Sequence, residues 1–173
     1  MQSTQFNLIS LFSLIIILYA FHFIEFNTIH KSQIHFIKQE VLMEKIGDLF
    51  KSSDWKKEKH VPVIECPDVV AAGELFQVKV TLGKEIPHPN TTEHHIRWIQ
   101  LFFMPEGDNF PYQIGHFEFN AHGESVKGAN EGPVYAEPTV IADFKIKVSG
   151  KFFAMAYCNI HGLWEGSTAI TVK

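Results

Sequence analysis

The chain has 173 residues, and its hydrophobic content of 46%, including 16 phenylalanines, is enough to build one domain with a sizeable core. Its formal net charge of -4 provides no overall basic field that would favour binding to nucleic acid. With only two cysteines, Cys66 and Cys158, it can form neither a disulfide framework nor a four-cysteine metal site.

The first 42 residues differ from the rest of the chain. Leu8 to Ile24 is almost wholly apolar, but it falls just short of the ~20 residues that span a bilayer. No lysine or arginine precedes Lys31 and no cleavage site is evident, which argues against a secretory signal. We favour a misassigned start, with Met43 as the natural first residue. The alternative is a membrane anchor, and the lysines that follow it would then place the main domain in the cytoplasm.

Residues 43–173 predict a single domain, in which a short helix precedes a series of strands. The segment Met43–Lys51 has helical spacing of apolar residues, and we expect it to pack on the outside. Ser149-Gly150 predicts a tight hairpin turn between its flanking strands. About seven short strands separated by Gly, Pro and Asn predict an all-β antiparallel sandwich. The expected strands are His60–Glu65, Leu75–Leu82, Ile96–Met104, Tyr112–Asn120, Val140–Val148, Phe152–Tyr157 and Thr168–Val172.

The run Tyr157–Gly162 contains a cysteine and a histidine at a spacing typical of a metal chelate. Cys158 lies three residues before His161, and Gly162 lets the backbone turn close to a metal. Backbone N–H groups of this short loop would point at the sulfur and lower its basicity. A sulfur with several imidazoles suits iron, copper or zinc, and a reducing compartment would keep the thiolate unoxidised. Trp164 either covers such a site or packs in the core.

Three further positions offer imidazoles from constrained segments. His60 lies two residues before a proline, and His88 is held between two prolines that exclude helix or central strand. His94 follows a turn-prone segment, and spacing alone cannot choose between it and His95. A strand beginning there would point the two rings to opposite sides, so at most one is a ligand. The other histidines after Met43 are interpreted as exposed or hydrogen-bonding residues: His116 and His122.

Three motifs resemble those of the superoxide reductases of the neelaredoxin type, which belong to the desulfoferrodoxin family. They are EKHVPVI at Glu58–Ile64, GKEIPHPNTTEHHI at Gly83–Ile96 and YCNIHGLWE at Tyr157–Glu165. The resemblance runs from about Asp54 to the C-terminus and does not cover the first 42 residues, which we call the leader. It implies an immunoglobulin-like form of the sandwich and assembly into a homo-oligomer, a tetramer in related proteins.

The same resemblance implies the ligands of a mononuclear non-haem iron, one per chain. Four imidazoles would surround the iron in a plane, the thiolate of Cys158 would be the axial fifth ligand, and the sixth position would be open. The resemblance also selects His94 over His95. The implied planar ligands are His60, His88, His94 and His161.

The activity implied by the resemblance is reduction of superoxide to hydrogen peroxide, with electrons from an external carrier such as rubredoxin. Lys59 would attract the anion and help to deliver protons, and Glu58 would ligate the ferric iron after product release. Without the resemblance, both would be read as part of a solvated charge run. A cupredoxin-like electron carrier is the main alternative, although no methionine follows His161 as a weak axial ligand. A structural zinc protein is a third, but tetrahedral zinc would leave one imidazole idle.

Overall fold

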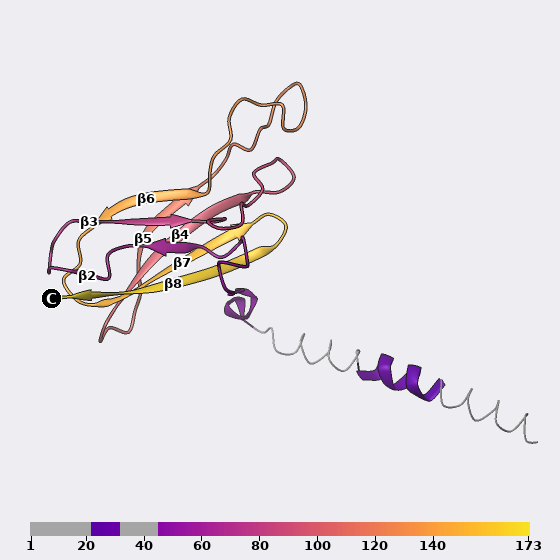
Figure 1. Cartoon of the computed structure of the whole chain (residues 1–173), viewed down its shortest axis with the longest axis horizontal. Helices are drawn as coiled ribbons and strands as arrows, with labels where there is room; N and C mark the ends of the chain where they lie inside the picture. The colour runs from indigo at the N-terminus through magenta and orange to yellow at the C-terminus, as the bar shows by residue number, and fades with distance from the viewer. Residues whose placement is uncertain (1–21, 32–44) are drawn as a thin grey trace, which may run out of the picture. The chain divides into compact units, whose positions relative to one another are not determined.

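The computed structural model describes residues 22–31 and 45–173 (Figure 1). The chain divides into two compact units, Met1–Asp48 and Leu49–Lys173. Residues 22–31 are helical, and no helix in the described ranges is long and apolar enough to cross a membrane. Most of residues 1–42 lie outside these ranges, so both interpretations of the leader stay predictions.

The predicted helix is shorter than expected and of a different type. A 3-10 helix, η1, covers Ile46–Leu49, and none of its residues is buried. Asp48 explains the tight turn, since its carboxylate accepts a hydrogen bond from the Lys45 backbone N–H and its own N–H bonds to the Lys45 carbonyl. Met43 lies outside the described residues.

Two sheets face each other as a β-sandwich, which confirms the predicted all-β class (Figure 1). One sheet has the order β1-β3-β6 and the other has the order β2-β8-β7-β4-β5. All pairings are antiparallel except the short one between β2 and β8. The strands are β1 Val63–Glu65, β2 Val69–Val70, β3 Phe76–Thr81, β4 Ile96–Pro105, β5 Tyr112–Glu118, β6 Thr139–Phe144, β7 Gly150–Cys158 and β8 Gly162–Val172.

The core lies between the sheets because alternate residues of each strand point inward. In β7 every second residue is fully buried, beginning at Phe152 and ending at Cys158. The Phe152 ring lies 5.0 Å from that of Phe103, centroid to centroid, in the middle of this layer. The thiol of Cys158 is therefore the last inward-facing group of β7, at the end of the sandwich where the strand stops.

The expected hairpin at Ser149-Gly150 is wrong. β6 pairs with β3 in one sheet, whereas β7 lies between β4 and β8 in the other, so this segment crosses between layers. Ser149 belongs to the second layer, since its carbonyl accepts a hydrogen bond from Glu106 N–H and its hydroxyl one from Val172 N–H. The strand predicted at Thr168–Val172 begins earlier, at Gly162, because β8 pairs with β7 from Gly162 to Ile170.

Candidate metal centre

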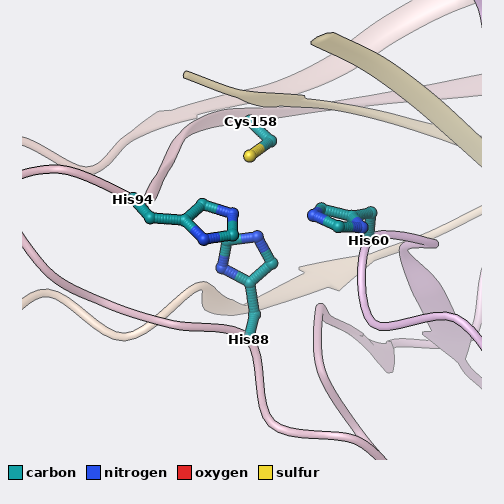
Figure 2. A group of neighbouring side chains, drawn as sticks. All are labelled: His60, His88, His94 and Cys158. Carbon is teal, nitrogen blue, oxygen red and sulfur yellow. The ribbon is translucent and has the colours of Figure 1, made fainter. Parts of the chain in front are cut away.

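Three connections at one end of the sandwich carry the predicted metal ligands. His60 lies just before β1, His88 and His94 lie between β3 and β4, and Cys158 ends β7. One donor atom from each of these four residues lies within 4.8 Å of every other. Figure 2 shows the three rings and the sulfur turned toward a common centre.

His161 adds a fifth donor to this group. Its Nδ1 lies 3.5 Å from the Cys158 sulfur and 3.2 Å from Nε2 of His94. Its ring centroid is 4.5 Å from that of His60. The structure therefore brings together all five side chains that the resemblance implied, with His161 on the exposed side of the cluster.

The turn between β7 and β8 positions Cys158 and His161. The two strands pair up to Cys158 and Gly162, which leaves three residues to reverse the chain. Gly162 has a φ of 78°, in the left-handed region that favours glycine. The backbone N–H of His161 donates to the Cys158 sulfur over 3.4 Å, as the short loop predicts. Such a contact orients the sulfur as a metal ligand.

His88 is fixed by the loop that precedes it. Gly83 has a φ of 73°, and a Cβ at this position would lie 2.4 Å from the backbone nitrogen of His88, so only glycine allows the loop to fold back. Nδ1 of His88 donates to the carbonyl of Pro89 over 2.6 Å, which leaves Nε2 for a metal. Burial lowers the pKa of His88 to about 4, although the bond to Pro89 opposes this effect.

His60 is held at one edge and on one face of its ring. Its Nδ1 donates to Oε1 of Glu58 over 2.6 Å, and the ring of Trp164 stacks on it at 4.9 Å with an interplanar angle of 17°. Trp164 is itself buried and donates through Nε1 to the carbonyl of His161 over 3.3 Å. The sequence predicted that Trp164 would either cover the site or pack in the core. It does both, because it is buried and its ring covers His60.

The donor atoms test whether a metal fits. Nε2 of His60 and Nε2 of His88 are buried and have no hydrogen-bond partner among the described residues. Such atoms are costly to bury unpaired, and in native proteins they require an explanation. Burial lowers the pKa of His60 and of His94, which favours the neutral rings that ligate metals. A cation held by imidazoles and a thiolate accounts for both orphaned atoms, and this donor set fits iron.

Glu58 and Lys59 both lie beside the cluster. The Glu58 carboxylate bonds to His60, and this hydrogen bond helps to lower its pKa against the opposing effect of burial. Lys59 is half-buried and forms no ion pair with any described residue. Its positive charge adds to the effect of burial in lowering the pKa of His60 and of His88.

A second pair of histidines stands behind the ligand loop. His95 is buried and stacks on His122 at 3.7 Å, so the two neighbours His94 and His95 do point to opposite sides as predicted. The ring nitrogens of His122 lie 2.8 Å from Oδ1 of Asn90 and 2.8 Å from the carbonyl of Phe119. This agrees with its interpretation as a hydrogen-bonding residue. The predicted exposure of His116 is also confirmed, since 43% of its side chain is exposed.

One residue near the site was missed by sequence reasoning. The side chain of Asn159 bonds to the loop that carries His94. The only signal in the sequence was its place directly after Cys158, next to a predicted ligand.

The fold and site together define a class of protein, a β-sandwich metalloprotein with one thiolate and several imidazole ligands. Comparison with known proteins narrows this class. The model of the family described as Desulfoferrodoxin matches residues 52–167. The neelaredoxin of Megalodesulfovibrio gigas is 61% identical over 129 residues, which cover 75% of this chain and 99% of that protein. The superoxide reductase of Pyrococcus furiosus is 58% identical over 125 residues, covering 72% and 98% respectively.

A solved structure agrees with these sequence matches. The superoxide reductase (neelaredoxin) from Archaeoglobus fulgidus in the reduced form superposes with a TM-score of 0.67 at 58% identity, covering 71% of this chain and 98% of that one. The chain therefore belongs to the desulfoferrodoxin family, among the superoxide reductases of the neelaredoxin type.

Proposed function

We propose that this protein reduces superoxide to hydrogen peroxide at one iron per chain. The ligands would be Nε2 of His60, His88 and His94, Nδ1 of His161 and the thiolate of Cys158. The observation that carries the proposal is the pair of buried, unpartnered Nε2 atoms beside a buried thiol. When bound, iron would supply one electron to superoxide, and two protons from solvent complete the conversion to hydrogen peroxide.

Lys59 is the residue proposed to bring the substrate in. It lies next to the ligand His60, and no described carboxylate neutralises it. A local positive charge raises the association rate of an anion by about 10 to 10³, and the gain falls with ionic strength. Lys59 would also orient the proton donors that complete the reaction. This assignment follows the resemblance and the position of the side chain.

Glu58 has a contact that the resemblance did not imply. Its carboxylate accepts the Nδ1–H of His60 and so fixes the orientation of that ring, with Nε2 toward the metal. Ligation of the ferric iron by Glu58 stays a proposal that rests on the resemblance. The two roles of Glu58 differ in when they apply. The contact with His60 would orient that ring in both the ferrous and the ferric protein, whereas ligation would occur only in the ferric protein.

The electron is proposed to come from a separate protein. The described residues contain one group of metal-binding side chains, so a second redox centre has no ligands there. A small carrier such as rubredoxin would make a brief contact with the end of the sandwich that holds the site. A cytoplasmic location and assembly into a homo-oligomer complete the proposal. The reducing compartment that a thiolate ligand at Cys158 needs supports the first, and the resemblance supports the second.

The test mixes ferrous protein with superoxide under anaerobic conditions and measures the yield of hydrogen peroxide, which separates reduction from dismutation. Reduction should give about one peroxide for each superoxide consumed and release no dioxygen. Dismutation would give about half as much peroxide, with dioxygen as the other product. The variant Cys158→Ser should lose the reaction, and His116→Asn, which changes an exposed histidine outside the site, should keep it. Dioxygen release by the unmodified protein at the dismutation yield would contradict the proposal.

A further inference from the structure

Asn159 connects the two loops that carry Cys158 and His94. Its Oδ1 accepts a hydrogen bond from the His95 backbone N–H over 2.8 Å. Its Nδ2 donates to the Glu93 carbonyl over 2.8 Å. Its own backbone N–H donates to the His95 carbonyl over 3.1 Å. Three hydrogen bonds of one residue thus reach the segment that carries His94.

The two side-chain bonds reach both sides of the same ligand. Glu93 and His95 flank His94, so one amide holds both ends of the short segment that carries this imidazole. The neighbour of Asn159 in the chain is Cys158, so the amide also fixes the separation of the imidazole and the sulfur.

Asn159 lies where the pairing between β4 and β7 becomes irregular. The two strands pair at Ile96 and Cys158, and an irregularity lies between Ile96 and Trp98. Beyond Cys158, one backbone hydrogen bond still joins the two segments, from Asn159 N–H to the His95 carbonyl. The side-chain amide reinforces this bond because it offers an NH2 donor group and an acceptor oxygen in the same plane. The reverse orientation of this amide would place two donors together at His95 and two oxygens together at Glu93.

We propose that Asn159 is a positioning residue of the metal centre, which holds His94 and Cys158 at the separation that the metal requires. This inference rests on the proposed function, because it assumes that both residues are ligands. Groups that orient the ligands of a metal typically change its affinity by about 10- to 100-fold when they are removed. The same range is expected here.

The experiment measures binding of Co²⁺ to the full-length protein after removal of its native metal. Co²⁺ is titrated against a chelator of known affinity, and the absorption from thiolate bound to Co²⁺ is recorded. The variants are Asn159→Ala, which removes both side-chain bonds, and Asn159→Asp. The aspartate keeps the shape and the acceptor but places an oxygen against the Glu93 carbonyl. The matched control is Asn109→Asp, in an exposed loop of the same domain.

We expect both Asn159 variants to bind Co²⁺ about 10- to 100-fold more weakly and to shift the thiolate absorption, whereas the control does neither. A purely structural role would instead lower the unfolding temperature of the metal-free protein and leave the spectrum of the loaded protein unchanged. Equal affinity and an equal spectrum in all variants would overturn the inference. So would failure of both Asn159 variants to fold without metal. Absence of thiolate absorption in the unmodified protein would instead refute the proposed ligand set.

Discussion

Protonation of His88 should make the metal-free protein unstable in acid. Burial lowers the pKa of this ring from 6.5 to about 4 in the folded chain, whereas the unfolded chain keeps the ordinary value. Between these two values the unfolded state binds a proton that the folded state does not. Stability therefore falls as the pH drops through this window, and it is unaffected by this group above pH ~7.

The size of the effect follows from the two pKa values. One pKa unit corresponds to about 1.4 kcal/mol, so protonation of His88 should lower the unfolding free energy by at most about 3.5 kcal/mol once the pH is well below 4. In the middle of the window the slope from this single group is close to about 1.4 kcal/mol per pH unit. Burial also lowers the pKa of His60 and of His94, and these rings steepen the total slope of the unmodified protein.

Denaturant unfolding of metal-free protein at a series of pH values measures this slope. In the variant His88→Asn, the unfolding free energy should change less steeply with pH between pH 6.5 and 4. The difference in slope should correspond to about one proton, whatever the absolute stability of the variant. His116→Asn is the control, because it removes an exposed histidine of the same domain, and its pH profile should follow that of the unmodified protein. A His88→Asn profile parallel to the unmodified one would refute the reasoning.

Three more predictions concern the metal, the leader and the charges before His60. Oxidised, iron-loaded protein should be blue from thiolate-to-iron charge transfer, and Cys158→Ser should abolish the colour; stoichiometric zinc or copper in natively expressed protein would contradict this. Protein without residues 1–42 should fold, bind iron and reduce superoxide like the full chain; an intact chain recovered from membranes would favour an anchor. Lys59→Ile should slow the reaction with superoxide by about tenfold or more and flatten its salt dependence, in a rapid-mixing salt series. Glu58→Ala should leave that rate nearly unchanged but shift the ferric absorption band and weaken iron binding through loss of the His60 contact.

The class of fold could be read from the sequence because alternating apolar residues mark strands with one buried face. Val78 and Val80 in β3, or Phe152 and Ala154 in β7, show this pattern directly. Strand partners could not be read in the same way. Ser149-Gly150 has the residues of a tight turn, but β6 pairs with β3 in one sheet whereas β7 pairs with β4 and β8 in the other. Local turn chemistry does not distinguish a hairpin from a crossing between layers.

The metal site was more predictable than the topology because its residues lie in short, constrained segments. Two prolines around His88 and a glycine after His161 restrict the backbone whatever lies around them. The supporting contacts could not be predicted, since each joins residues far apart in the chain. Asn159 bonds across to Glu93 and His95, and nothing in the sequence around it indicates that partner.

X-ray absorption at the iron edge of loaded, reduced protein identifies the atoms bound to the metal. We expect one sulfur and about four nitrogens as ligands, with the sulfur lost in Cys158→Ser and one nitrogen lost in His161→Ala. The second variant matters because His161 lies on the exposed side of the cluster and is proposed to bind through Nδ1. Absence of a sulfur ligand in the unmodified protein, or an unchanged ligand set in both variants, would contradict the proposed site.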